Sequence, residues 1–308
     1  MQLISLALTA LTMRIPTLAR LPALLSSRMP PLVLALSLGA CANVPTQERL
    51  LSPQPDQQLA VRSQPCAAAR VVGSPLKAGP MATLDGRTLR VLSWNLHKGE
   101  DHGWQRDLTR FAGEHDLLLL QEAVLLPSLT AVLDQSGHGW QMAGAFSWGG
   151  VERGVMTASR VPAFDGCTTR NFEPLFPIPK SALITRYALS GTNDTLAVAN
   201  LHGVNFSLGV GHIREQIEGV AAELARHQGP VIWGGDFNTW SQARHAVLVE
   251  VTDRLGLTAI HLVEDGRKRV FGLALDHMFV RGLSVQQARA PEVTSSDHNP
   301  IMVTLSLR

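Results

Sequence analysis

The sequence has few cysteines and lacks the cysteine and histidine patterns that bind zinc. Its 308 residues include 3 Cys, which form no C-x-x-C pair, and there is no H-E-x-x-H motif and no ladder of Cys and His. Zinc sites draw their ligands from such patterns, so this absence argues against a zinc protein. No glycine-rich phosphate loop and no internal repeat is present either, which argues against a P-loop nucleotide site.

The sequence also lacks a large excess of charge of one sign. Charged residues make up 17%, hydrophobic residues 45%, and the net charge is +2, a composition typical of a globular protein. Residues 1–40 contain three arginines and no acidic residue, so the remaining chain is close to neutral. It lacks the broad positive field of a general nucleic-acid binder, and DNA or RNA would need a local patch. Arg267-Lys268-Arg269 is a compact basic run, which is either a solvated loop or an active-site rim that attracts a polyanion.

A short apolar run, residues 31–40, follows the three arginines. About ten mostly apolar residues match the core of a signal peptide and are too few to span a bilayer. The run ends at Leu38-Gly39-Ala40-Cys41, which resembles a bacterial lipobox, whose cysteine thiol receives a diacylglycerol. We expect residues 1–40 to be a lipoprotein-type signal peptide and Cys41 to carry a lipid that anchors an exported protein to a membrane of the bacterial envelope, in the periplasm or at the outer membrane. An ordinary cleaved signal, an uncleaved anchor and a protein that is not exported stay open as alternatives.

Residues 41–85 are rich in Pro, Gln, Ala and Ser and show little apolar periodicity. This composition predicts a flexible tether between the leader and a catalytic domain spanning residues 86–308. The tether contains Cys66, and the other cysteine beyond the leader is Cys167. An exported compartment permits a disulfide between them, and two isolated thiols are the alternative.

From residue 89 onward, short apolar runs alternate with amphipathic stretches. The expected strands are 89–95, 116–121, 154–159, 182–189, 196–201, 231–234, 275–280 and 301–307, and the expected helices are 104–114, 127–135, 213–227 and 241–255. Residues 117–120 are all leucine, which predicts a strand covered on both faces, whereas 182–189 mixes polar and apolar residues and is expected further out. Strands interleaved with helices predict an α/β protein with helices outside stacked sheets.

Polar residues occur where the apolar runs end. They are Asn95, Gln121, Glu122, Asn200, His202, Asp236, Asn238, Asp276, Asp297 and His298. Polar groups at the ends of packed strands form a rigid cluster, and functional residues concentrate at such positions. The carboxylates and amides are hard oxygen donors, which suit Mg²⁺ or Mn²⁺ better than a softer metal. Such an ion would bind a phosphate and activate a water, with histidines contacting the phosphoryl oxygens.

Six short motifs, in order, resemble those of the endonuclease/exonuclease/phosphatase superfamily. They are Trp94-Asn95, Gln121-Glu122, Asn200-Leu201-His202, Gly235-Asp236-Phe237-Asn238, Leu275-Asp276 and Ser296-Asp297-His298. Residues 180–183, 204–210 and 296–300 are in addition similar to the bacterial YafD-like branch. The resemblance implies a four-layer α/β sandwich, in which two mixed β-sheets lie face to face between flanking helices.

The resemblance also implies which residues bind a metal ion. Glu122 would be the principal ligand of Mg²⁺ or Mn²⁺, assisted by Asn95 and Asp297. The sequence departs from the family in two respects. Its single tyrosine, Tyr187, does not sit where some branches place an active-site tyrosine, and the extra acid of several members has only Glu152 as a candidate.

Catalytic roles follow from the same resemblance. Asp236 would orient or deprotonate the attacking water, and Asn238 would hold the phosphate. His298 would contact the phosphoryl group, with Asp276 fixing and charging its imidazole. His202 matches the second active-site histidine of the deoxyribonuclease and sphingomyelinase branches.

The expected function is metal-dependent hydrolysis of a phosphodiester by in-line attack of an activated water. A phosphoester substrate is implied, with DNA or RNA as the leading candidates. Hydrolysis of a phospholipid headgroup or of a phosphomonoester is the alternative, and a noncatalytic binding module on the same scaffold is less favoured. Export and lipidation favour the lipid, whereas the sequence shows no obvious hydrophobic hairpin that would insert into a membrane.

Overall fold

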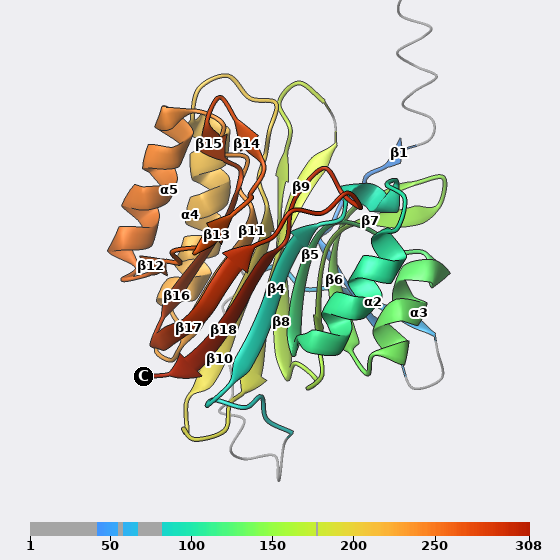
Figure 1. Cartoon of the computed structure of the whole chain (residues 1–308). Helices are drawn as coiled ribbons and strands as arrows, with labels where there is room; N and C mark the ends of the chain where they lie inside the picture. Colours follow the sequence, from blue (N-terminus) through green and yellow to red (C-terminus); the bar gives the residue numbers. More distant parts are fainter. Residues whose placement is uncertain (1–41, 55–57, 67–81, 177) are drawn as a thin grey trace, which may run out of the picture. The chain divides into compact units, whose positions relative to one another are not determined.

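Two mixed β-sheets form the centre of the computed structural model, which describes residues 42–54, 58–66, 82–176 and 178–308 (Figure 1). Within these ranges the larger sheet has ten strands, in the order β13 (Glu264–Asp265), β17 (Leu283–Ala290), β18 (Ile301–Leu307), β4 (Leu89–Asn95), β5 (Leu117–Val124), β7 (Val151–Ser159), β6 (Gly139–Trp148), β2 (Arg49–Pro53) and β3 (Leu59–Ser63), with β1 (Ala42–Asn43) paired to β6. The smaller sheet has six, in the order β12 (Thr258–Ala259), β16 (Asp276–Arg281), β11 (Val231–Asp236), β10 (Thr195–His202), β9 (Pro179–Ala188) and β8 (Asp165–Phe172). A separate hairpin joins β14 (Arg269–Val270) to β15 (Leu273–Ala274). Both sheets are mixed, since β4–β5 and β10–β11 are parallel pairs among mostly antiparallel ones.

Helices cover the outer face of each sheet, which gives four layers (Figure 1). The larger sheet is covered by α2 (Trp104–Glu114) and α3 (Pro127–Gln135), and a short 3₁₀ helix, η2 (His97–Gly99), follows β4. The smaller sheet is covered by α4 (Gly211–Ala225) and α5 (Gln242–Arg254). The predicted four-layer α/β sandwich is therefore confirmed. None of the helices in the described ranges is long and apolar enough to cross a membrane.

The four consecutive leucines of β5 show how the layers are built. Leu117 and Leu119 pack into the core between the two sheets, and Leu118 and Leu120 pack under α2 and α3. All four are fully buried, because alternate side chains of a strand point to opposite faces and both faces are covered here. The prediction of a doubly covered strand is confirmed.

The expected outer position of residues 182–189 is wrong. The segment belongs to β9, which lies between β10 and β8 and is buried along most of its length. Its charged side chain is buried with partners. Arg186 pairs with Asp165 of β8 and Glu223 of α4. A buried charge is tolerated when it is paired and hydrogen-bonded, so polar composition did not indicate exposure here.

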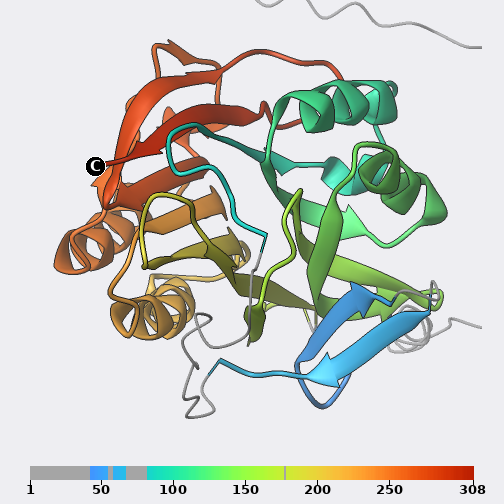
Figure 2. The ribbon, with the colours of Figure 1, turned by 90° about the horizontal axis from the view of Figure 1, so that it is seen from below.

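Residues 42–54 and 58–66 do not form the flexible tether that composition predicts for 41–85, of which residues 41, 55–57 and 67–81 lie outside the described residues. Strand β2 pairs with β3 and with β6, so this segment extends the larger sheet beyond β6 (Figure 2, blue). Leu51 is fully buried against the core under α2 and α3, and Leu50 packs beside Val155 and Leu183. Two apolar side chains and a ladder of backbone hydrogen bonds hold an edge segment that otherwise has a loop-like composition.

A disulfide joins Cys66 to Cys167. It follows the β3 segment and attaches it to β8, where the Cys66 N–H also donates a hydrogen bond to the Thr168 carbonyl oxygen at 3.0 Å. Of the two alternatives that the sequence left open, the structure has the pairing. The bond ties the edge segment at its far end to the smaller sheet.

Candidate active site

Neighbouring strand ends place three of the candidate residues side by side. In the smaller sheet, His202 at the end of β10 is in register with Asp236 at the end of β11, and Asp236 is in register with Asp276 at the start of β16. Residues paired across adjacent strands point to the same face of the sheet, with their Cβ atoms about 5 Å apart. Asn95 ends β4 of the larger sheet, and its Nδ2 donates a hydrogen bond to Asp236 Oδ2 at 3.1 Å. The two sheets therefore meet at this cluster.

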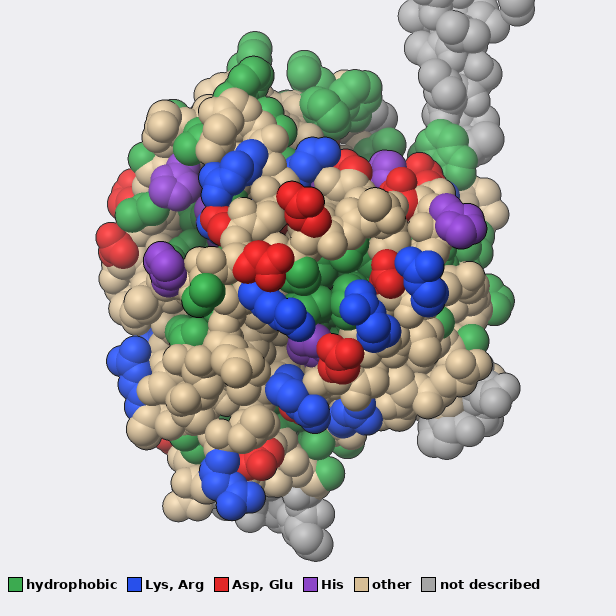
Figure 3. Space-filling model, viewed as in Figure 1, with side chains coloured by type: hydrophobic (Ala, Val, Ile, Leu, Met, Phe, Trp, Pro, Cys, Tyr) green, Lys and Arg blue, Asp and Glu red, His purple; other side chains and the backbone are tan. Residues whose placement is uncertain are grey.

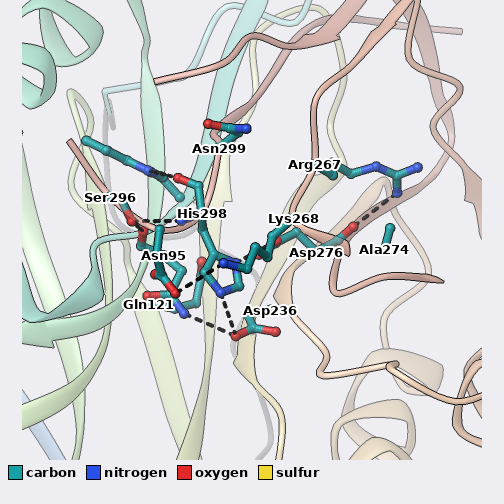
Figure 4. A network of polar contacts seen from close by, with 12 residues as sticks. Asn95, Gln121, Asp236, Arg267, Lys268, Ala274, Asp276, Ser296, His298 and Asn299 are labelled. Atoms are coloured by element: carbon teal, nitrogen blue, oxygen red, sulfur yellow. Dashed lines mark hydrogen bonds and ion pairs between the residues drawn. The ribbon is translucent and has the colours of Figure 1, made fainter. Parts of the chain in front are cut away.

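His298 lies between Asp276 and Asp236 (Figure 4). Its Nδ1 donates a hydrogen bond to Asp276 Oδ2 at 2.7 Å, and its Nε2 lies 4.0 Å from Asp236 Oδ2. The Trp94 indole N–H donates to the His298 carbonyl oxygen at 2.9 Å, and the His298 N–H donates to Ser296 Oγ at 3.1 Å. Burial alone would lower the pKa of His298, but the charges of Asp276 and Asp236 outweigh burial and raise this pKa to about 10. His298 is thus a cation at neutral pH, oriented by Asp276.

Asp236 is buried and receives hydrogen bonds on both carboxylate oxygens. Oδ1 accepts from the backbone N–H of Asn238 at 2.9 Å, and Oδ2 accepts from Asn95. Burial raises the pKa of Asp236 to about 6; the positive charge of His298 opposes this rise, and the negative charge of Asp276 adds to it. A carboxylate with a pKa near 6 can accept a proton at neutral pH, which suits a general base.

A β-bulge aims Glu122 into the same region. The register between β5 and β7 shifts between Leu120 and Ala123, and Glu122 has a φ of 50°, in the left-handed region. Such a conformation costs a non-glycine residue on the order of 1 kcal/mol and is concentrated at functional positions. Lys98, in the 3₁₀ helix after β4, also has a positive φ, of 62°, and its Nζ lies 3.4 Å from Glu122 Oε2. Two locally strained residues therefore face each other.

His202 is brought into the cluster, but in a neutral state. Its Nε2 lies 3.7 Å from Glu122 Oε1 and 3.7 Å from Asp236 Oδ2. Lys180 Nζ donates a hydrogen bond to that nitrogen at 2.9 Å. Burial lowers the pKa of His202 well below 6.5, and the charges of Lys180 and His298 lower this pKa further. Lys180 is therefore a cation in direct contact with His202. Sequence reasoning gave Lys180 no role, although residues 180–183 carry part of the resemblance to the YafD-like branch.

Asn238 sits in a rigid turn after β11. Its φ is 51°, its Nδ2 donates to the Gly203 carbonyl oxygen at 2.8 Å, and its backbone carbonyl oxygen accepts from Arg244 Nε at 2.8 Å. Arg244 is fully buried and also donates to Ser207 Oγ at 2.9 Å. The turn that carries Asn238 is in this way attached to the loop after β10.

Asp297 lies at the rim of the cluster. Its carboxylate is 3.7 Å from Lys268 Nζ and 3.9 Å from His97 Nδ1, and its side chain is 42% exposed. Arg267 and Arg269 of the basic run pair with Asp265, and Arg267 also donates a hydrogen bond to the Asp276 carbonyl oxygen at 3.0 Å (Figure 4). Lys268 is the member of the run that pairs with Asp297.

Two motif residues lie beneath the site and connect the sheets. Gln121 Nε2, on β5, donates a hydrogen bond to Asn200 Oδ1, on β10, at 2.8 Å. Asn200 Nδ2 donates to the Met156 carbonyl oxygen of β7 at 3.0 Å. Both amides are fully buried, so they hold the strand ends at a set distance rather than touching a ligand.

The remaining candidates lie outside the cluster. Glu152, considered as an extra acid, forms an ion pair with Arg49. Tyr187 is buried in the core between the sheets. Cys41 lies outside the described residues, so its predicted lipidation stays a prediction.

The two sheets and their flanking helices define the class of protein, a four-layer α/β sandwich with a charged cluster at its strand ends. The chain belongs to the Endonuclease/Exonuclease/phosphatase family, whose family model matches residues 92–298. Members of this family are phosphoesterases, among them nucleases and phosphatases.

Known proteins similar to the chain include a UPF0294 protein of Vibrio cholerae serotype O1, which is 39% identical over 225 residues, covering 73% of this chain and 79% of that protein. A solved endonuclease/exonuclease/phosphatase from Beutenbergia cavernae is 18% identical, with a TM-score of 0.57 and 72% of each chain covered. A mannosyl-6-phosphatase from Bacteroides thetaiotaomicron is 19% identical, with a TM-score of 0.55, and covers 71% of this chain and 100% of its own. These two structures show a shared fold. The narrower resemblance to the YafD-like branch stays a prediction.

Proposed function

We propose that this chain is a divalent-metal-dependent phosphoesterase that hydrolyses a phosphodiester by in-line attack of an activated water. The observation that carries the proposal is the buried line from Asp276 through His298 to Asp236. His298, held by Asp276, supplies a fixed cation, and Asp236 supplies a carboxylate that can take a proton. Both are needed where a phosphoryl group is attacked by water.

The oxygen atoms beside this line fit a hard divalent cation such as Mg²⁺ or Mn²⁺. Glu122 Oε2 is buried and accepts no hydrogen bond from the described residues. Lys98 Nζ lies 3.4 Å from it, so a positive charge already stands where a metal ion would bind. Asn95 and Asp236 add an amide and a second carboxylate close by. Glu122 and Asn95 would hold the ion, with Asp297 reaching it from the rim. When bound, it would neutralise phosphate oxygens and lower the pKa of a water molecule.

The residues of the charged cluster each have a separate role in hydrolysis. Asp236 orients the attacking water and takes its proton as the new P–O bond forms. His298 donates a hydrogen bond through Nε2 to a phosphoryl oxygen, on which negative charge builds while the ester P–O bond breaks. The leaving alkoxide takes a proton from solvent. Asn238 holds the phosphate, and Lys180, hydrogen-bonded to the neutral His202, places a second positive charge at the site.

Catalysis is favoured over a noncatalytic binding module by the electrostatics. A buried carboxylate with a raised pKa, such as Asp236, is costly to keep ionised, and buried groups with strongly shifted pKa values concentrate at catalytic sites. A phosphodiester as substrate, rather than a monoester, stays a proposal, and so does its nature as DNA or RNA. On the face shown in Figure 3, Lys and Arg side chains are interspersed with Asp and Glu, which offers little support for an extended nucleic-acid track.

Turnover of a generic diester tests the proposal. Bis(4-nitrophenyl) phosphate should be hydrolysed with Mg²⁺ or Mn²⁺ and not in excess chelator. His298→Ala should abolish turnover, whereas His261→Ala, at an exposed histidine outside the cluster, should not. Full activity in chelator would refute the metal dependence, and equal activity of the two variants would refute the role of His298.

We also propose that the protein is exported and anchored by a lipid on Cys41, because an apolar run ends at a lipobox-like motif there. The measurement is intact mass and membrane fractionation of the wild type against Cys41→Ser. Identical N-termini and solubility in both, with no lipid mass on the wild type, would refute the anchor and leave the phosphoesterase proposal standing.

A further inference from the structure

An apolar cavity of about 220 Å³ opens directly beside the candidate active site. Glu122, His202 and Lys180 line one side of it and belong to the charged cluster. Phe146, Phe176, Phe206, Ile178 and Val124 line much of the rest. A phosphoester held at Glu122 therefore has an apolar chamber next to one of its ester groups.

Exposed apolar side chains surround the mouth of this cavity. Leu175 and Phe176 lie on the loop between β8 and β9, next to Phe172 at the end of β8, and Phe206 and Leu208 lie on the loop between β10 and α4. We call these five residues the apolar rim. Leu175 is 64% exposed and Leu208 is 91% exposed. Figure 3 shows hydrophobic side chains gathered at the upper edge, over the loops that top the smaller sheet in Figure 1. Contiguous exposed apolar patches of this kind mark protein or membrane contacts.

The rim is a preformed surface. Glu173, on the first loop, is buried and accepts hydrogen bonds from the backbone N–H groups of Asn205 at 2.7 Å and Phe206 at 2.8 Å, on the second loop. The rings of Phe176 and Phe206 meet edge to face, with their centroids 5.2 Å apart. Because a buried carboxylate and an aromatic pair join the loops, the apolar groups stay presented to solvent.

The described chain begins at the same end of the molecule. Ala42 pairs with Trp148 and Asn43 with Ser147, on the hairpin that joins β6 to β7. The same hairpin supplies Phe146 and Arg153 to the cavity. A lipid on Cys41, if present, would be attached one residue before this pairing. The proposed anchor and the mouth of the cavity would then face the same membrane surface, with no long spacer between them.

Positive charge lies where the phosphate of a lipid would enter. Lys98, Lys180 and Arg153 all line the cavity. Arg153 Nε is buried and makes no hydrogen bond to the described residues. Cations beside an apolar chamber complement a molecule with an anionic phosphate and an apolar body.

We propose that the substrate is a phospholipid taken from a membrane surface, on which the apolar rim rests while the cavity receives the first part of an acyl chain. This inference rests on the proposed phosphoesterase function and names its substrate class. A nucleobase is a poorer occupant, because base recognition uses hydrogen bonds to the base edges. Phe146, Ile178 and Val124 offer none from their side chains, and the polar lining residues Glu173 and Ser181 are already bonded to backbone groups. A bound nucleotide would also leave Leu175 and Leu208 exposed.

The first experiment measures membrane binding by the full chain. Wild type, Leu208→Asp and Val263→Asp are sedimented with vesicles of phosphatidylglycerol and phosphatidylcholine. Val263 is the matched control, since it is also 91% exposed and lies outside the rim. Leu208→Asp should lower the partition coefficient on the order of tenfold, the loss expected when a leucine no longer leaves water. Val263→Asp should leave it unchanged. Equal binding by all three proteins would overturn the rim as a membrane surface.

The second experiment separates the inference from the proposed function. Short-chain phosphatidylglycerol, phosphatidylethanolamine and phosphatidylcholine are each compared with the corresponding deacylated glycerophosphodiester, alongside a single-stranded oligonucleotide and bis(4-nitrophenyl) phosphate, all with Mg²⁺ and Mn²⁺. For at least one headgroup, kcat/KM should be at least about tenfold higher for the acylated form, and Phe206→Ala should reduce that ratio. Hydrolysis of bis(4-nitrophenyl) phosphate with no acyl preference, or a preference for the oligonucleotide, would overturn the lipid assignment alone. No turnover of any diester would overturn the proposed function itself.

Discussion

Replacing Asp276 by asparagine isolates the charge that acts on His298. The amide has nearly the same shape as the carboxylate, and its oxygen can still accept the hydrogen bond that His298 Nδ1 donates at 2.7 Å. The His298 imidazole should keep its orientation, but the negative charge of Asp276 beside it is removed. Asp194→Asn, at an exposed aspartate outside the cluster, is the matched control.

The pKa of His298 sets the size of the effect. Its rise from 6.5 to about 10 corresponds to about 5 kcal/mol. This figure is the net of burial, which lowers the pKa, and of the charges of Asp276, Asp236 and Asp297, which raise it. Without the charge of Asp276, burial dominates, and the pKa of His298 in Asp276→Asn should fall below about 7. At pH 8 its imidazole would then be mostly neutral. We expect kcat at pH 8 to fall by about 10²–10³, with partial recovery near pH 6.

The same shift predicts how stability depends on pH. A histidine whose pKa is raised by folding stabilises the fold fully below its unfolded pKa, and this contribution is lost as pH rises through the folded pKa. The difference in melting temperature between wild type and Asp276→Asn should therefore be largest below pH 6.5 and should vanish near pH 10.

Three measurements check this reasoning. They are the pH profile of kcat, an NMR titration of the His298 ring proton assigned by its absence in His298→Ala, and melting temperatures from pH 5 to pH 10. An Asp276→Asn protein whose His298 still titrates near pH 10, or whose activity profile matches wild type and Asp194→Asn, would refute the role of Asp276.

Four further predictions concern the metal ligand, the base, the amide pair and the disulfide. Glu122→Gln removes a charged oxygen ligand, so its affinity for Mn²⁺ by calorimetry should fall at least about tenfold, and an unchanged affinity would exclude Glu122 as a ligand. Asp236→Asn should lower kcat by about 10²–10⁴ yet raise the melting temperature of metal-free protein at pH 7. Because folding raises the pKa of Asp236 from 3.8 to about 6, ionisation of Asp236 lowers the free energy of unfolding as pH rises through this range. A melting temperature of Asp236→Asn below that of the wild type would contradict this pKa. Asn200→Leu removes one acceptor of the buried Gln121 amide and the donor to the Met156 carbonyl oxygen, which should cost about 1–3 kcal/mol in chemical denaturation; no loss would show that the pair is dispensable. Cys66→Ser removes a cross-link between residues 101 apart, so unfolding should become easier by about 2–5 kcal/mol, and dithiothreitol should destabilise only the wild type.

The secondary structure was predictable where local periodicity was strong. Helices α2 and α3 and strands β4 and β18 have the bounds that the apolar spacing predicts. The prediction missed β6, β8 and β17, whose sequences mix polar and apolar residues. These strands are stabilised by their neighbours in the sheet, and strand preference depends on such context more than helix preference does.

The membership of the active-site cluster was predictable for a related reason. A polar residue that ends an apolar strand is visible in the sequence, and parallel or paired strands bring such ends together. Lys98 and Lys180 were missed, because no local pattern distinguishes a lysine that reaches into a site from one in solvent. Their placement depends on a strained turn after β4 and on the pairing of β9 with β10.

By itself, the sequence determined the helices and strands with strong apolar periodicity, the polar residues at their ends and the oxygen-rich set of side chains there, because all three depend on residue type and short-range spacing. The tertiary structure alone decided which groups carry charge and which surface is apolar. His202 and His298 are both buried histidines, yet His298 is charged beside Asp276 and His202 is neutral beside Lys180. The apolar rim likewise has no counterpart in any single run of the sequence, because Phe176 and Phe206 meet only through folding. Both properties come from neighbours that are distant along the chain and close in space, where charge and solvent exclusion act over a few ångströms.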